Sequence, residues 1–248
     1  MTPAIRTWLG LARSLMIYRS RPWQQARLAA FYARILRPGD LAFDIGAHVG
    51  NRSRAMLRTG ARVVALEPQR LFHAFLARDL PPGVTLLPLA AGPQPGRADL
   101  AVSSLHPTVS SLASDFPGRM RGAPGFDAVR WDTHQQVEVT TLDALITRFG
   151  MPRFIKIDVE GFEAEVLAGL SHPVPWLAFE YLPAEPARAQ ACLDRLAQLG
   201  PYRFNLVSGE ATDFALADWT DAAALAPSLA AAARDGRSGD IYARLNDG

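Results

Sequence analysis

The chain has 248 residues, of which 49% are hydrophobic and 20% are charged, a composition typical of a globular protein with a full core. No apolar run approaches the roughly 20 residues that span a bilayer, so no membrane-spanning helix is predicted. The single cysteine, Cys192, excludes an internal disulfide, and we expect a buried thiol in a cytoplasmic protein.

The net charge of +2 conceals an uneven distribution along the chain. Residues 1–39 contain seven arginines and no acid, which leaves 19 basic against 24 acidic residues in the remainder. Because this larger part is mildly acidic, we do not expect the protein to bind nucleic acid.

Residues 1–39 are predicted to form a basic helical extension, followed by one domain over residues 40–248. The first helix has an apolar face, with Arg6 and Arg13 lying off it. The residues that share this face are Ile5, Trp8, Leu9, Ala12, Leu15 and Met16.

A second helix is predicted to restart at Ser20 and Pro22 and to end at Pro38-Gly39. Its apolar positions repeat at intervals of three and four residues, at Leu28, Phe31 and Ile35. Two interpretations of the pair remain open. The helices cover the domain as a lid or packing pair, or they contact a membrane surface or an acidic partner protein.

The segment F-D-I-G-A-H-V-G-N, residues 43–51, ends an apolar run with an acid and two glycines spaced four apart. A second apolar run ends in Glu67-Pro68. This layout is typical of a nucleotide-binding unit. In such a unit the glycines let the backbone approach the ligand, and the second acid accepts hydrogen bonds from two ribose hydroxyls. Asp44 stands where a pyrophosphate would lie. A ligand without phosphates that carries an ammonium or sulfonium, such as S-adenosylmethionine, therefore fits better.

From residue 41 onward, strands and helices alternate, which predicts a mostly parallel sheet with helices on both faces. The strands are predicted near 41–45, 62–66, 84–89, 154–158 and 176–181, and the helices near 51–59, 69–78, 162–169 and 185–199. Further strands are predicted at 97–102 and 137–141, and a closing antiparallel pair at 202–207 and 240–245.

An irregular segment, roughly residues 103–136, is rich in Ser, Pro, Gly, His and Arg. It is too long to be a passive connection within a compact domain. An active-site lid or substrate loop and a disordered insertion are both consistent with this composition.

The segment 154–163 carries charges at alternate positions, so Lys156, Asp158 and Glu160 are predicted to share one face at the carboxyl end of a strand. Ligands of open α/β sheets bind beyond these strand ends. A charge inside a strand is costly unless paired, so we expect Lys156 to contact Asp158 or Glu180 on the next strand. Lys156 is the single lysine beside 25 arginines, which indicates a site that needs a small cation or a titratable amine.

Together these motifs resemble the FkbM family of S-adenosylmethionine-dependent methyltransferases, over about residues 40–182. The matching segments are 43–51, 64–68, 139–143, 155–161 with Glu163, and 177–180. The resemblance implies a Rossmann-like α/β fold of the class I methyltransferase type, with a mostly parallel sheet and a closing antiparallel strand. It also implies methyl transfer to a hydroxyl of a sugar, glycolipid or natural product.

The resemblance further implies a cofactor site made from the glycine motif after the first strand, the acid after the second strand and residues after the third strand. The first motif would hold the methionine end, the acid after the second strand the ribose, and two alanines after the third strand the adenine. The predicted cofactor residues are Asp44, Gly46, Ala47, Gly50, Asn51, Glu67, Pro68, Ala90 and Ala91, with Asp158 beside the methyl group.

Methyl transfer requires alignment of an acceptor oxygen with the methyl carbon and removal of the acceptor's proton. We predict that Asp158 is the base or orients the acceptor, that Lys156 tunes it, and that Glu180 or His48 assists. Asp158, Glu160 and Glu180 could also bind Mg²⁺. Metal dependence is not favoured, because pairing with Lys156 accounts for the same carboxylates.

Two other functions remain open from the sequence, an NAD-type oxidoreductase and a non-catalytic scaffold that keeps the fold. The missing third glycine and the acid at position 44 count against the oxidoreductase. The expected partner is a small-molecule or glycan acceptor. The sequence leaves the acceptor and the oligomeric state undetermined.

Overall fold

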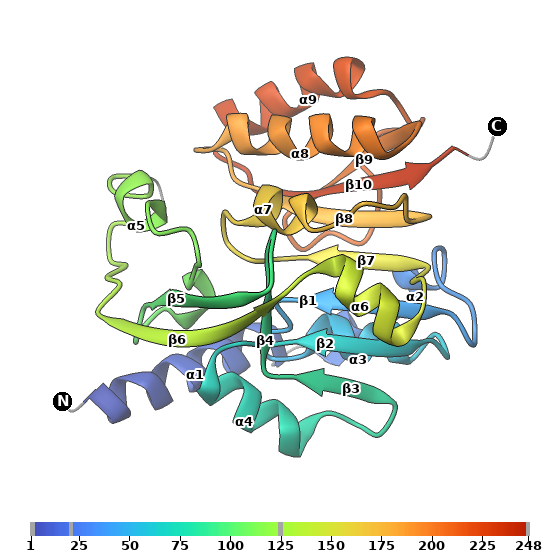
Figure 1. The fold of residues 1–248 in the computed structure, drawn as a ribbon. Coiled ribbons are helices and arrows are strands. Elements are labelled where there is room, and N and C mark those ends of the chain that lie inside the picture. Colours follow the sequence, from blue (N-terminus) through green and yellow to red (C-terminus); the bar gives the residue numbers. More distant parts are fainter. Residues whose placement is uncertain (1–2, 20–21, 124–125, 247–248) are drawn as a thin grey trace.

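The computed structural model describes residues 3–19, 22–123 and 126–246, which fold around a seven-stranded sheet (Figure 1). Its strands are β1 (Leu41–Ile45), β2 (Arg62–Leu66), β3 (Val84–Leu87), β7 (Phe154–Ile157), β8 (Trp176–Tyr181), β9 (Tyr202–Ser208) and β10 (Gly239–Leu245). Their order is β3-β2-β1-β7-β8-β10-β9, and β10 runs antiparallel to both its neighbours. The pairings from β3 to β8 are parallel. A smaller sheet contains β4 (Leu89–Ala91), β6 (Thr133–Thr140) and β5 (Gly96–Val102), in that order.

Helices cover both faces of the seven-stranded sheet (Figure 1). The helices of the described residues are α1 (Pro3–Arg19), α2 (Pro22–Tyr32), α3 (Asn51–Leu57), α4 (Arg70–Asp79), α5 (Phe116–Arg119), α6 (Leu142–Phe149), α7 (Glu163–Ala168), α8 (Pro186–Leu199) and α9 (Ala222–Arg234), with a 3-10 turn η1 (Pro107–Val109); α5 lies away from the large sheet. Side chains of α6 to α9 pack on one face, and those of α2 and α3 pack on the other.

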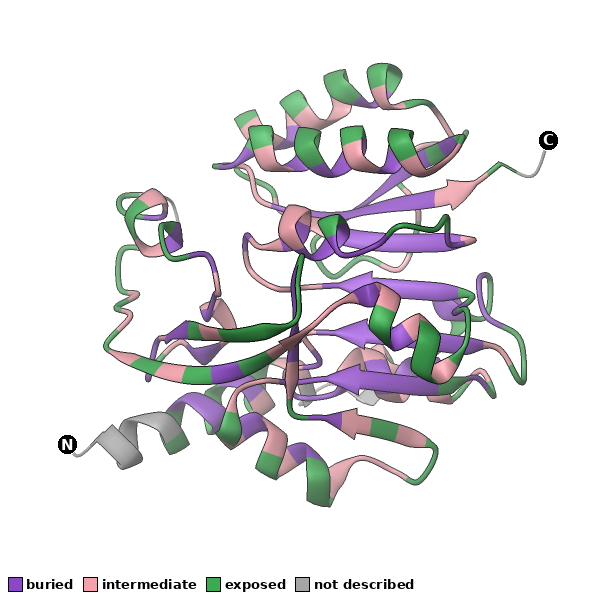
Figure 2. Ribbon diagram, in the orientation of Figure 1, coloured by how far each residue is buried: buried purple, intermediate pink, exposed green. Residues whose placement is uncertain are grey.

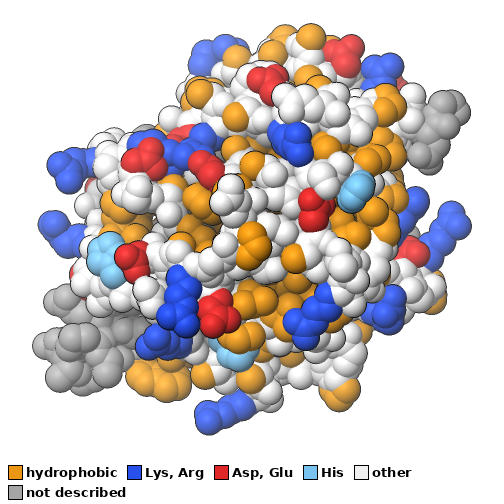
Figure 3. Space-filling model, viewed as in Figure 1, with side chains coloured by type: hydrophobic (Ala, Val, Ile, Leu, Met, Phe, Trp, Pro, Cys, Tyr) orange, Lys and Arg blue, Asp and Glu red, His pale blue; other side chains and the backbone are white. Residues whose placement is uncertain are grey.

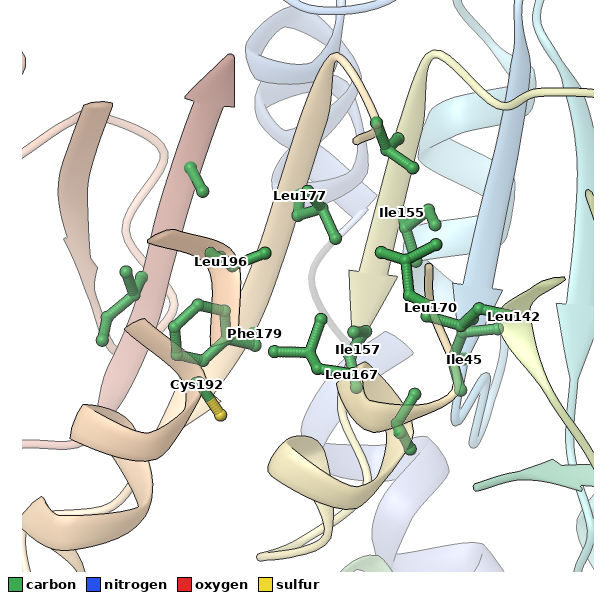
Figure 4. Close-up of a cluster of buried hydrophobic side chains, with 14 of the residues drawn as sticks. Ile45, Leu142, Ile155, Ile157, Leu167, Leu170, Leu177, Phe179, Cys192 and Leu196 are labelled. Carbon is green, nitrogen blue, oxygen red and sulfur yellow. The ribbon is translucent and has the colours of Figure 1, made fainter. Parts of the chain in front are cut away.

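Side chains along the central strands alternate between two hydrophobic clusters, as the period of a strand requires. Ile45 of β1 and Ile157 of β7 pack toward α7 and α8, where Cys192 is buried as expected (Figure 4). Ala42 and Phe154 of the same strands pack toward α2 and α3. Figure 2 shows these central strands buried along their length.

The same alternation places the polar ends of the strands on the face that α2 and α3 cover. Asp44 lies two residues after Ala42, and Lys156 lies two residues after Phe154, so both side chains continue the apolar row of this face. The strand order reverses at β1 and β7, and ligands of such sheets bind in the crevice at that point.

The strand predicted at 84–89 is interrupted at Pro88, which has no backbone N–H to donate to a neighbouring strand. The chain leaves the large sheet there and continues as β4 in the small one. The antiparallel pairing of β5 with β6 begins at Thr133, earlier than the predicted 137. Helix α6, which the sequence did not predict, begins after Thr141, whose hydroxyl accepts a hydrogen bond from the Ala144 N–H.

Most of the predicted apolar face of α1 does not pack on the domain. The residues of that face that are exposed are Trp8, Leu9, Ala12 and Met16. The helix instead buries Leu11, which packs with Val49 and Phe72, and Ser14, which contacts His48. The side chains of Ile5 and Arg6 lie outside the described residues.

The second helix, α2, ends at Tyr32, earlier than predicted, although Phe31 and Ile35 are buried as expected. Ser20 and Arg21, where this helix was expected to restart, lie outside the described residues. Among the helices of the described ranges, none has the combination of length and apolar character that crossing a bilayer requires.

Candidate active site

The loops that follow β1 and β7 touch at the point where the strand order reverses. The N–H of Asp158 donates to the Ile45 carbonyl at 2.9 Å. Gly46 has a φ of 89°, and a Cβ at this position would lie 1.9 Å from the Asp158 carbonyl oxygen. Glycine is therefore required here on two grounds, the left-handed backbone and the close approach of the two loops.

Asp44 ends β1 as a buried carboxylate that is only partly satisfied. The Ser53 hydroxyl donates to Oδ2, whereas Oδ1 is buried and has no hydrogen-bond partner among the described residues. Burial raises the pKa of Asp44 above its usual value. An unsatisfied buried acceptor costs about 1–3 kcal/mol, so a donor such as the cofactor's ammonium would be stabilised at this oxygen.

A cleft of about 610 Å³ opens beside this loop. Its walls include four of the predicted residues for the methionine end, Asp44, Gly46, Ala47 and Asn51. Gly50 does not line it; with a φ of 77° it forms the turn at the start of α3.

Glu67 follows β2, and its carboxylate is fixed by backbone donors. The N–H groups of His48 and Gln69 donate to its two oxygens at 2.7 and 2.8 Å. Burial outweighs these bonds and raises the pKa of Glu67 to about 8. Each oxygen retains a lone pair, so the carboxylate can still accept hydrogen bonds from the ribose hydroxyls.

A second cavity, of about 60 Å³, adjoins the cleft. It is lined by the predicted ribose and adenine residues, Glu67, Pro68, Ala90 and Ala91. The walls of both cavities include Gly46, His48 and Asp158, and the segment 103–136 contributes Thr108 to both. A bound cofactor can therefore extend from Asp44 to Glu67 and pass Asp158 on the way.

Lys156 is fully buried, with 0% of its side chain exposed, and is held by carboxylates on two strands. Its Nζ lies 3.2 Å from Asp158 Oδ2 and 3.0 Å from Asp240 Oδ1, and it donates to the Ile157 carbonyl at 3.1 Å. The predicted partner Asp158 is thus confirmed. The second partner is Asp240 on β10 and not the predicted Glu180 on β8, because β10 pairs with β8 and brings Asp240 opposite Glu180.

Arg52, in the first turn of α3, joins the same two carboxylates. Its guanidinium lies 3.6 Å from Asp158 and 3.4 Å from Asp240. Two cations therefore alternate with two carboxylates, which compensates the cost of removing Lys156 from water. We name Arg52, Lys156, Asp158 and Asp240 the charge quartet.

The charge quartet keeps Asp158 ionised. Burial opposes the charged form, but Lys156 and Arg52 together hold the pKa of Asp158 below its usual value. For Lys156, burial is likewise outweighed by Asp158 and Asp240, and its pKa is raised. Lys156 is therefore a permanent cation near neutral pH. Of the two expectations for this lysine, the geometry supports the small cation and contradicts the titratable amine.

The pKa values of Glu160 and Glu180 are shifted in the opposite direction to that of Asp158. Burial, together with repulsion from neighbouring carboxylates, raises the pKa of both well above the usual value. Oxygens of Glu160, Glu180 and Asp158 lie within 4.8 Å of one another and could hold a divalent ion. Lys156 and Arg52, however, already neutralise Asp158, and their positive charges oppose a dication beside it.

His48 lies between the cofactor loop and α1. Its Nε2 lies 3.2 Å from the Ser14 hydroxyl oxygen, and its ring packs against those of Tyr18 and Phe72. Burial lowers the pKa of His48 to about 4, so the ring is neutral at neutral pH. With a pKa this low, the imidazole is a weak base near neutral pH. His48 therefore contributes to the site mainly by lining it.

The sequence matches the profile of the family described as "Methyltransferase FkbM domain" over residues 44–232, which is more than half of the chain. The chain belongs to the FkbM methyltransferase family. The family assignment confirms the predicted Rossmann-like α/β fold and S-adenosylmethionine as the cofactor, and the protein is an S-adenosylmethionine-dependent methyltransferase. No curated protein sequence matches the chain.

Three solved structures that resemble this chain are remote from it in sequence. A TehB-like S-adenosylmethionine-dependent methyltransferase from Corynebacterium glutamicum is 10% identical, with a TM-score of 0.49, over 99% of this chain and 100% of that chain. An O-methyltransferase from Bacillus cereus is 14% identical, with a TM-score of 0.46, over 98% and 90%. A precorrin-6Y C5,15-methyltransferase from Geobacter metallireducens is 13% identical, with a TM-score of 0.44, over 89% and 87%.

Two members of the charge quartet of this FkbM methyltransferase were missed in the sequence. Arg52 directly follows the glycine motif, and its position in the first helical turn was an available signal. Asp240 begins β10, beyond the segment that matches the family, and no local pattern connects it with Lys156. Tyr18, which lines the cleft, was also not predicted as a site residue. Its carbonyl accepts a hydrogen bond from Asn51 Nδ2 at 2.7 Å.

The segment 103–136 is largely folded in this methyltransferase. Within its described residues, η1 and α5 are formed, and Ser104, Ser110 and Phe116 are buried. Thr108 lines both cavities, and Ser110 lines the smaller one. Of the two interpretations, the substrate-loop interpretation agrees with this geometry better than the disordered insertion does.

Proposed function

We propose that this FkbM methyltransferase transfers a methyl group to a hydroxyl of a sugar, glycolipid or natural product. The observation that supports it is the position of Asp158. Its carboxylate is 28% exposed and lines both the cavity that carries Glu67 and the larger cleft. An acceptor hydroxyl in the cleft can therefore donate to Asp158 at the boundary between the two spaces.

The cofactor supplies a methyl carbon already activated by its sulfonium, and transfer forms the oxygen–carbon bond while the carbon–sulfur bond breaks. Asp158 accepts the hydrogen bond of the acceptor hydroxyl, orients its oxygen and receives its proton as positive charge develops on that oxygen. Because its pKa is lowered, Asp158 is a weak base before transfer, and its main contribution is orientation and electrostatic stabilisation.

Lys156 and Arg52 act through Asp158 by fixing its position and charge. Lys156 is buried away from both cavities, so it is a positioning residue and does not touch the acceptor. Glu180, which lines neither cavity, would also act through Asp158 and Glu160. At the cofactor, we assign Asp44, Gly46, Ala47 and Asn51 to the methionine end, and Glu67, Pro68, Ala90 and Ala91 to the nucleoside.

The proposal is tested in two steps with the full chain. Calorimetry with S-adenosylmethionine and S-adenosylhomocysteine measures cofactor binding. Incubation with the methyl-labelled cofactor and fractions of sugars, glycolipids and small hydroxylated metabolites then identifies the acceptor. Label in a base-stable ether of an acceptor oxygen supports O-methylation. Label on nitrogen or carbon, or in nucleic acid, would refute it.

A further inference from the structure

The outward face of α1 is apolar and exposed. The exposed fractions are 62% for Trp8, 50% for Leu9, 71% for Met16 and 53% for Ile17. Scattered single apolar residues are normal on a surface, but here four large ones follow one side of a single helix. Three of the four, Trp8, Leu9 and Met16, belong to the apolar face predicted from the sequence.

The inward face of α1 fixes the orientation of the helix. Leu11 packs with Val49 and Phe72, and Ser14 contacts His48. At Gly10 the helix approaches the segment before η1 so closely that a Cβ would lie 2.6 Å from the Ser104 carbonyl oxygen. The helix therefore cannot rotate to bury its apolar side without losing these contacts.

The charge of this region complements an anionic surface. Residues 1–39 contain seven arginines and no acid, and Arg13 and Arg27 are exposed. Trp23, on α2, is 61% exposed. Elsewhere acids and bases are mixed, as on the face shown in Figure 3. Tryptophan and arginine with aliphatic residues on an exposed helix are typical of segments that lie in a membrane interface.

The same helices border the active-site cleft. Met16, Ile17 and Tyr18 of α1 and Leu28 of α2 line the cleft of about 610 Å³, as Asp158 does. A surface that contacts α1 therefore lies next to the opening through which an acceptor reaches Asp158.

We propose that α1 and α2 dock this enzyme on an anionic lipid surface, and that the acceptor is a lipid-anchored molecule that enters the cleft from this surface. The substrate class rests on the methyl transfer proposed above. A second copy of the chain is a poorer occupant, because a symmetric interface would bring two arginine-rich, acid-free segments together. An acidic protein would satisfy the arginines but leaves the exposed tryptophans unexplained.

The test for docking is co-sedimentation of the full chain with vesicles of phosphatidylcholine alone or mixed with phosphatidylglycerol. We expect binding to the mixed vesicles that weakens with added salt. The Trp8→Gln/Leu9→Gln double variant and Arg13→Glu should each lower the partition coefficient at least tenfold. The matched control is Met151→Gln, an exposed apolar residue just before β7 and far from α1 in the chain, which should bind as the parent does.

Folding and cofactor binding are checked in the same variants by thermal unfolding and by calorimetry with S-adenosylhomocysteine. None of the altered side chains lines either cavity, so both measurements should match the parent. No partition to mixed vesicles would overturn the docking proposal. If the parent does not bind vesicles and the double variant abolishes self-association or binding of an acidic protein, the face is a protein interface and the docking proposal is overturned.

The acceptor class is tested separately with methyl-labelled cofactor and membranes. Label that enters organic-soluble products, and that is reduced in the double variant, supports a lipid-anchored acceptor. Efficient methylation of water-soluble acceptors without vesicle binding would overturn this inference and leave the proposed function intact. Vesicle binding without methylation of any hydroxyl acceptor would overturn the proposed function and the substrate class, and leave the docking intact.

Discussion

Lys156 Nζ lies 3.0 Å from Asp240 Oδ1, and this ion pair joins β7, inside the segment that matches the family, to β10, outside it. Strand β10, which lies between β8 and β9, therefore contributes to the site as well as to the sheet. It supplies one of the two carboxylates that keep the buried lysine charged, and the lysine in turn holds Asp158 at the boundary of the two cavities.

Replacing Asp240 by Asn should destabilise the protein by about 3–5 kcal/mol, because Lys156 and Arg52 would then share one buried carboxylate. Urea unfolding measures the change. The surface acid Asp235, which pairs with Arg237 in solvent, is the control, and Asp235→Asn should cost less than about 1 kcal/mol. Equal effects of the two variants would contradict the structural role assigned to Asp240.

Asp158→Asn should lower kcat for methyl transfer by about 10²-fold or more, because the amide neither carries the negative charge nor takes the acceptor's proton. Lys156→Arg should also lower kcat by about 10²-fold, since the larger guanidinium in this fully buried position displaces Asp158. Turnover with labelled cofactor provides the measurement. Calorimetry with S-adenosylhomocysteine measures cofactor binding in both variants separately, and near-parental turnover in both would remove these residues from the mechanism.

Cofactor affinity should increase as the pH rises toward 8. Burial raises the pKa of Glu67 to about 8, so the free protein holds this carboxyl protonated below that pH. Two ribose hydroxyl donors favour the ionised form, and binding must then release the proton, which costs up to tenfold in affinity per pH unit below 8. Calorimetry with S-adenosylhomocysteine from pH 6 to pH 9 measures this dependence, and Glu67→Gln should abolish it.

The raised pKa of Glu67 also makes the stability of the ligand-free protein depend on pH. Because the folded-state pKa of Glu67 exceeds its ordinary value of 4.5, the folded state binds the proton more tightly than the unfolded state does. The stabilisation is complete below about pH 4.5 and is lost as the pH rises to about 8. Unfolding free energy measured without ligand should therefore fall less steeply across this window in Glu67→Gln than in the parent.

Gly46→Ala should destabilise the protein by about 3 kcal/mol or more, or prevent folding, because the added Cβ meets the Asp158 carbonyl oxygen. Gly39→Ala is a matched control. Gly39 has a φ of 88°, against 89° for Gly46, but a Cβ there would meet nothing within 4 Å. Its cost should be limited to about 1–2 kcal/mol of backbone strain. Similar unfolding free energies for the two variants would show that the loops separate easily.

Treatment with EDTA should change the rate of methyl transfer by less than twofold. Asp158 is already neutralised by Lys156 and Arg52, and a dication at Asp158, Glu160 and Glu180 would lie beside these two cations. Activity that is lost in EDTA and restored by Mg²⁺ would instead establish a metal site at these carboxylates.

Much of the fold and part of the site could be predicted from the sequence. The strands at 41–45, 62–66 and 176–181 were predicted with their observed bounds, because apolar runs between turn residues indicate buried strands. The glycine motif predicted the turn at Gly46, and alternation along 154–160 predicted the contact between Lys156 and Asp158. These features depend on residues that are neighbours in the chain.

The remaining features were decided by the tertiary structure. Asp240 meets Lys156 because β10 inserts beside β8, and Arg52 reaches both carboxylates because α3 packs against β1, which lies next to β7. The outward orientation of Trp8 on α1 likewise depends on contacts made by the other side of the helix. Hydrophobic periodicity determines that a helix or strand has an apolar face. It does not determine what that face meets, because the partner is set by strand order and helix packing across distant parts of the chain.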